Sequence, residues 1–193
     1  MDLFIPRDKK ATVGWLALAG LGLAGLATTT LWAAPRTAFG GMVIKDQFAV
    51  FISLIILVGT GLTVLISLRY LPEEGVHLGE YYAFLLTASL GMTIMASGNH
   101  LMVIYVGLEL MSLSLYVLAG FLKKDPKSAE AALKYFLLSI FSSGILLYGI
   151  ALAYGLTGAL SLEGVREGLL LGDRKSTRLN SSHIQKSRMP SSA

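Results

Sequence analysis

The sequence predicts an all-α membrane protein, a bundle of about five transmembrane helices. Of its 193 residues, 54% are hydrophobic and only 15% are charged, and the mean hydropathy is +0.65. Several apolar runs reach the length of about 20 residues that a helix needs to cross a bilayer. The chain has no cysteine, which excludes disulfides and redox centres held by sulfur. We therefore expect a membrane protein that carries no electrons by that route.

The excess positive charge lies at one end of the chain. Residues 1–172 hold equal numbers of basic and acidic side chains, whereas residues 173–193 hold five Lys/Arg against Asp173 and supply the whole net charge of +4. On composition alone this Ser-rich tail is a disordered basic arm. However, residues 173–183 back-translate without mismatch to a common short-read sequencing adapter. We therefore interpret the tail as a translated adapter and predict no nucleic-acid partner.

The first apolar run covers residues 11–34 and is rich in glycine and alanine. Small residues allow close helix packing in a membrane. A basic start followed by an apolar run also fits a signal peptide, and this alternative is the main competitor. The run is longer than a usual signal-peptide core and more spans follow it, so we predict a retained helix.

Four further spans follow in order, at residues 47–68, 81–98, 101–121 and 128–154. The turn between the spans at residues 81–98 and 101–121 is tight, which predicts that these third and fourth spans form an antiparallel hairpin. Ser128 follows a Lys-rich loop and is expected to cap the fifth helix. These spans form a bundle over 11–158.

Residues 159–172 are expected to be an extramembrane amphipathic or loop segment. Seven Lys/Arg near the span ends fall on the side of the N-terminus, against three on the other side. The excess of basic residues marks the cytoplasmic side, so we expect the N-terminus of this chain to be cytoplasmic.

Glu109 lies at the middle of the fourth span, near the bilayer midplane, where an unpaired charge costs at least ~2.5 kcal/mol. Tyr105, Ser112 and Tyr116 share its helix face, at spacings of four, three and seven residues respectively. Burial raises the proton affinity of a carboxyl and a nearby cation lowers it. The stripe therefore predicts a reversible proton site, with a neutral, hydrogen-bonded structural carboxyl as the alternative.

Lys134 is a second intramembrane charge, with Glu130 one turn before it. That spacing suits a local ion pair. We predict that Lys134 takes part in proton translocation with Glu109, while a snorkelling lysine paired with Glu130 is the alternative. Tyr135, Ser139 and Ser142 form a further polar line on this helix. The sequence contains no phosphate loop, nucleophile triad or metal-ligand spacing, so we expect no cofactor or metal in this chain.

Two motifs resemble a known family: GLELMSLSLYVLAGF at residues 107–121 and SAEAALKYFLLSIFSSG at residues 128–144. They are similar to the subunit N family of bacterial proton-pumping NADH:quinone oxidoreductase, respiratory complex I. The resemblance covers about residues 1–172. It implies a larger antiporter-like fold of fourteen helices in which Glu109 matches an essential glutamate and Lys134 a lysine on the next helix.

The resemblance also implies that the chain is a fragment. Residues 1–10 look like the end of the family's first helix, so the five spans would be family helices two to six. The seventh helix, which supplies the lysine that pairs with the glutamate, would lie beyond them.

The resemblance implies a non-redox membrane subunit of this translocase, in the bacterial inner membrane, coupling quinone reduction to proton pumping. Its partners would be the other membrane subunits and the lipid bilayer, with NADH and quinone bound only elsewhere in the complex. Two alternatives remain open. One is a subunit of a multi-subunit cation/proton antiporter or membrane-bound hydrogenase, and the other is an inactive structural membrane fragment.

Overall fold

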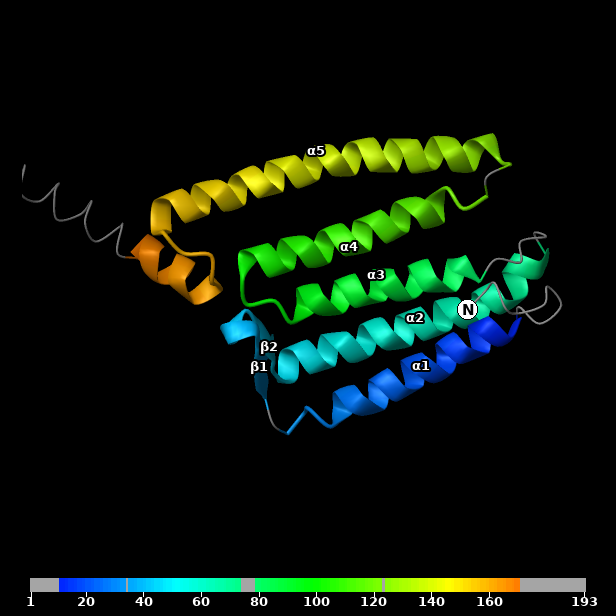
Figure 1. Ribbon diagram of the computed structural model, residues 1–193, viewed down its shortest axis with the longest axis horizontal. Coiled ribbons are helices and arrows are strands. Elements are labelled where there is room, and N and C mark those ends of the chain that lie inside the picture. The colour runs from blue at the N-terminus through cyan, green and yellow to red at the C-terminus, as the bar shows by residue number, and fades with distance from the viewer. Residues whose placement is uncertain (1–10, 34, 74–78, 123, 171–193) are drawn as a thin grey trace, which may run out of the picture.

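The computed structural model describes residues 11–33, 35–73, 79–122 and 124–170. Their five long helices are α1 (Ala11–Thr29), α2 (Gln47–Glu73), α3 (Glu80–Ala96), α4 (Leu101–Ala119) and α5 (Pro126–Thr157). The helices lie side by side and run alternately in opposite directions (Figure 1). The predicted all-α class and the hairpin of the third and fourth spans are confirmed. Our interpretations of residues 1–10 and 173–193 fall outside the described residues.

Four of the described helices, α1, α2, α4 and α5, are long and apolar enough to cross a membrane. The fifth, α3, has 17 residues and is shorter. Large apolar side chains point outward from these helices, among them Leu138 and Phe141 of α5, which are 71% and 76% exposed. Outward apolar side chains suit contact with lipid or with further membrane helices rather than with water.

The buried core lies among α1, α2 and α3. Ala17, Leu21, Val64, Leu71 and Tyr82 form one cluster there. Leu71 explains why α2 continues to Glu73, beyond the end at residue 68 that we predicted. Its burial against α1 and α3 stabilises one further helical turn, although the sequence there is polar and contains a proline.

The fifth helix begins before the residue that we predicted. Asp125, not Ser128, is the N-cap, because the Asp125 Oδ1 accepts a hydrogen bond of 3.0 Å from the Lys127 backbone N–H. Pro126 takes the first helical position, where no N–H is needed. The Ser128 hydroxyl instead donates to the Ala119 carbonyl, 2.7 Å away, and so ties the start of α5 to the end of α4.

A short β-hairpin, which we did not predict, joins α1 to α2. Its strands are β1 (Arg36–Ala38) and β2 (Val43–Lys45), separated by the turn η3 (Phe39–Gly41). Gly40 and Gly41 have φ values of 64° and 87°, which glycine adopts without a steric cost. The hairpin lies at the end of the bundle that also holds the turn between α3 and α4 (Figure 1).

The connections at this end of the bundle are held by backbone hydrogen bonds. The Ile44 N–H donates to the Ser97 carbonyl at 2.8 Å, and the Asn99 N–H donates to the Met42 carbonyl at 2.9 Å. These hydrogen bonds fix the ends of α2, α3 and α4 relative to one another.

Residues 162–170, which we expected to be amphipathic or a loop, are helical.

Candidate functional site

The middle of α4 and the middle of α5 meet at a carboxyl group. Glu109 is half-buried on α4, and the Ser143 hydroxyl of α5 donates to its Oε1. The same hydroxyl oxygen lies 3.1 Å from the Tyr105 hydroxyl, one turn before Glu109. Ser143 is only 9% exposed. The structure therefore places Glu109 at the end of a three-residue hydrogen-bonded chain that links two helices.

This chain fits both protonation states of the carboxyl. When Glu109 is ionised it only accepts, so Ser143 donates to it and Tyr105 can donate to Ser143. When Glu109 is protonated it can donate to Ser143, and the remaining hydroxyl proton then turns toward Tyr105. Every group keeps a partner in both states, as a reversible proton site requires.

The rest of the predicted stripe lies nearer the end of α4. Ser112 and Tyr116 are both buried, 5% and 8% exposed. The Tyr116 ring packs edge-on against Tyr135, with ring centroids 5.0 Å apart, and against Phe136 at 5.5 Å. Tyr116 is thus part of an aromatic contact between α4 and α5, and the structure separates it from the hydrogen bonds at Glu109.

The structure does not bring Lys134 to Glu109. Lys134 pairs with Glu130 at 2.5 Å, as the spacing predicted, and both side chains are more than 60% exposed. Ser143 follows Lys134 by nine residues, about 13 Å along the helix and half a turn around it. Since Ser143 contacts Glu109, Lys134 lies on the opposite face of α5, about two and a half helical turns from that contact.

Close packing of α3 and α4 fixes the position of the helix that carries Glu109. A Cβ atom added at Gly107 would lie 2.9 Å from the Gly91 carbonyl oxygen and 2.9 Å from the Met95 nitrogen. At Gly91 it would lie 2.6 Å from the Met111 nitrogen. Only glycine allows this approach of the two backbones.

Ser143 is the site residue that sequence reasoning missed. It lies in the second family-like motif, but the polar line read from the sequence used Ser139 and Ser142 instead. Ser142 is exposed, and its hydroxyl donates to the Leu138 carbonyl of its own helix.

Among the residues that the structure describes, no group of three or more His, Asp or Glu is placed to hold a metal ion.

Comparison with known proteins gives a consistent result. Residues 98–184 match the family described as "NADH:quinone oxidoreductase/Mrp antiporter, TM". NADH-quinone oxidoreductase subunit N of Trichlorobacter lovleyi is 48% identical over 158 residues, which are 82% of this chain and 32% of that protein. This chain is a homologue of subunit N. Subunit N 1 of Koribacter versatilis is 45% identical over 179 residues, covering 88% of this chain and 35% of the relative.

Solved structures support the same relation. A chain of respiratory complex I from Thermus thermophilus with bound aureothin matches with a TM-score of 0.71 and 35% identity, over 88% of this chain and 39% of that chain. An archaeal membrane-bound sulfane sulfur reductase matches with a TM-score of 0.61 and 24% identity, over 82% of this chain and 34% of that one, which shows the fold alone. The chain spans about one third of the length of the subunit N relatives that it matches.

Proposed function

We propose that this chain is part of a proton-translocating subunit N of NADH:quinone oxidoreductase, in which Glu109 takes up and releases a proton. The observation that carries the proposal is the hydrogen-bonded carboxyl in the middle of a membrane-length apolar helix. A carboxyl at that depth is costly, and intramembrane ionisable groups commonly serve proton relays. The homology to subunit N supplies the class of machine in which such a relay acts.

In this proposal the groups at the site have separate roles. Glu109 holds the proton, Ser143 moves it to or from the carboxyl, and Tyr105 keeps the Ser143 hydroxyl partnered in both states. Lys134 acts on Glu109 only through space, because its own contact is the ion pair with Glu130. Ser112 and Tyr116 then support the α4–α5 contact and do not touch the proton.

The subunit would contribute no redox chemistry of its own. Quinone reduction and NADH oxidation would take place elsewhere in the complex and would alter the charges near Glu109 through neighbouring membrane subunits. The chain would lie in the bacterial inner membrane. The start of α5 lies at the same end of the bundle as the start of α1 (Figure 1), so Lys124 and Lys127, which lie at the start of α5 in the sequence, would face the cytoplasm.

The proposal is tested by Glu109→Gln in the full-length parent subunit within the assembled complex. Glutamine keeps the size and the hydrogen bond of the side chain but cannot ionise. We expect NADH-driven proton uptake by inverted membrane vesicles to fall at least tenfold, with assembly unchanged. The matched control is Glu163→Gln, an exposed glutamate outside the long helices that pairs with Arg166 at 3.3 Å.

A purely structural carboxyl gives the opposite result. If Glu109→Gln vesicles assemble normally and pump at the rate of the unmodified complex, Glu109 is not the proton site. The proposal also fails if the Glu163→Gln control loses pumping to the same extent, because the loss would then follow from any lost carboxylate.

A further inference from the structure

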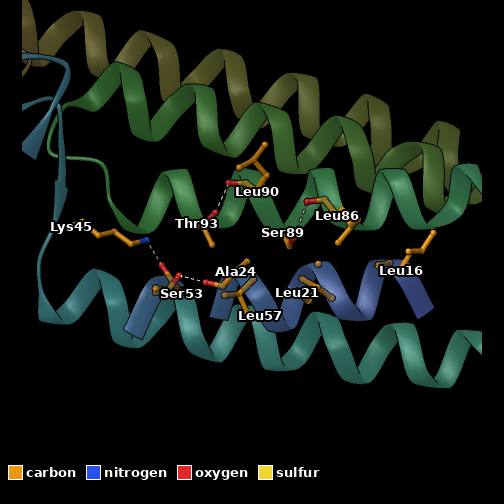
Figure 2. Close-up of a pocket in the computed structure, with 13 residues that line it drawn as sticks. Leu16, Leu21, Ala24, Lys45, Ser53, Leu57, Leu86, Ser89, Leu90 and Thr93 are labelled. Carbon is orange, nitrogen blue, oxygen red and sulfur yellow. Dashed lines mark hydrogen bonds between the residues drawn. The ribbon is translucent and has the colours of Figure 1, made fainter. Parts of the chain in front are cut away.

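A groove runs among α1, α2 and α3, away from Glu109. Its volume is about 380 Å³, and leucines with small residues form most of its wall. Gly20 of α1 lines the groove, and a Cβ atom added there would meet nothing within 4 Å. Lys45 lies at one end and Leu16 at the other (Figure 2).

The charged end of the groove is built on the β-hairpin. The Lys45 ammonium donates to the Ser53 hydroxyl at 2.7 Å and to the Ser97 hydroxyl at 3.3 Å. Both serines are buried. Two of the three ammonium protons are thereby used, and no carboxylate of the described residues lies within ion-pair distance of Lys45. The half-buried cation is held in place with one donor left over.

A second basic residue lies opposite Lys45 on the neighbouring strand. Arg36 of β1 is the cross-strand partner of Lys45 in the hairpin. Directly opposite residues of an antiparallel pair project from the same face, and like charges there destabilise the pair. Arg36 also has no carboxylate partner among the described residues. Two basic side chains on one face of the hairpin, neither paired with a carboxylate of the described residues, can together bind an anion.

The length of the groove matches one leaflet of a membrane. Its lining on α1 extends from Leu16 to Thr28, twelve residues or about 18 Å of helix. One leaflet of a bilayer has a hydrocarbon depth of about 15 Å, half of the full core. Lys45 lies just before the start of α2, where the apolar part of the bundle ends. The cations are thus at headgroup level, and the apolar wall extends inward from them.

We propose that the groove binds one anionic phospholipid of the surrounding bilayer, with an acyl chain along α1 and the phosphate at Lys45 and Arg36. The occupant is identified by charge complementarity at one end and by apolar length at the other. Basic pockets between transmembrane helices bind anionic lipid head groups on the cytoplasmic side of membranes, and the same charge complementarity is available at the opposite end of the bundle, where the hairpin lies. This site is independent of the proton site, since α1 and α2 do not contribute to the Glu109 contacts.

The test uses the full chain in nanodiscs that contain equal amounts of phosphatidylglycerol and phosphatidylcholine. Native mass spectrometry of the released protein then measures which lipid stays bound. We expect one phosphatidylglycerol to be retained at least fivefold in preference to phosphatidylcholine. Excess inorganic phosphate should not displace it, because the acyl chain holds the lipid in the groove.

Three variants separate the two parts of the site. Lys45→Gln should lower the preference for phosphatidylglycerol at least threefold while a lipid is still retained. Gly20→Leu fills the groove and should abolish retention of either lipid. Gly22→Leu is the matched control, because Gly22 also meets open space but does not line the groove. Circular dichroism checks that each variant is helical, and Ala24→Leu replaces Gly20→Leu if that variant does not fold.

Each contrary result overturns the proposal. Equal retention of the two lipids by the unmodified chain, or no retention of either, removes the anionic lipid. An unchanged preference in Lys45→Gln places the head group elsewhere, and displacement by inorganic phosphate shows an anion site without a lipid. If Gly20→Leu retains phosphatidylglycerol as well as Gly22→Leu does, the acyl chain does not occupy the groove.

Discussion

Ser143→Ala tests whether the hydrogen bond to Glu109 serves proton transfer. The substitution removes one hydroxyl and leaves the carboxyl and the helix in place, because alanine is the best helix former. Among the described residues, the Ser143 hydroxyl forms hydrogen bonds with Glu109 and Tyr105 and not with the backbone, so no backbone bond is lost. A hydrogen bond to a charged group contributes roughly 1.5–3 kcal/mol. If that energy is lost from the transfer step, the rate falls about 10- to 160-fold.

The assay is proton uptake by inverted membrane vesicles that carry the full-length subunit in the assembled complex. NADH oxidation is measured in parallel, so that a loss of pumping is separated from a loss of assembly. Ser142→Ala is the matched control, because its exposed hydroxyl donates 3.0 Å to the Leu138 carbonyl of its own helix. We expect that control to pump within twofold of the unmodified complex, and Ser143→Thr to regain part of the activity.

The reasoning is refuted if Ser143→Ala pumps within twofold of the unmodified complex at normal assembly. It is also refuted if Ser142→Ala is impaired to the same degree, because the effect would then belong to α5 as a whole. Failure of Ser143→Thr to recover any activity would show that a hydroxyl at this position is not sufficient for proton transfer.

Three further predictions concern stability, measured as the free energy of unfolding in mixed detergent micelles. Gly91→Ala should lower it by about 1–2 kcal/mol, since the new Cβ would lie 2.6 Å from the Met111 nitrogen, whereas Gly149→Ala, which meets open space, should raise it by up to about 1 kcal/mol. Asp125→Ala should cost about 0.5–2 kcal/mol through the lost cap of α5, and an unchanged value would mean that another group caps the helix. Burial lowers the pKa of the Lys45 ammonium below its ordinary value of 10.5, so the unfolded chain holds that proton to higher pH than the folded one. Stability should therefore rise as the pH increases toward 10.5, and this slope should be flatter in Lys45→Gln.

The order and type of the helices could be predicted because apolar runs of membrane length leave a clear signal. The errors lie where tertiary contacts decide. The extra turn of α2 depends on the burial of Leu71 against α1 and α3, which a polar local sequence does not reveal. The β-hairpin is two strands of three residues, too short for a periodic pattern, and the bond from Ile44 to Ser97 that anchors it joins residues far apart in the sequence.

The part of the site that lies on a single helix could be predicted, and the part that depends on contacts between helices could not. Helical spacing alone places Tyr105 beside Glu109, because residues four apart share a face. Ser143 lies on another helix, and its place opposite Glu109 depends on the antiparallel register of α4 and α5. That register is set by contacts such as the one between Ser128 and Ala119, which no local pattern indicates.

The distance from Lys134 to Glu109 limits what that lysine can do alone. Lys134 precedes Ser143, the residue that contacts Glu109, by about 13 Å along α5. At that separation and an effective dielectric constant near 20, one unit charge acts on another by about 1.3 kcal/mol. That changes the proton affinity of a carboxyl by less than a factor of ten, whereas a cation at 4 Å would act by about 4 kcal/mol. No basic side chain of the described residues forms an ion pair with Glu109. If Glu109 is the proton site that we propose, a change of more than tenfold in its proton affinity requires a charge that approaches it more closely than Lys134 does.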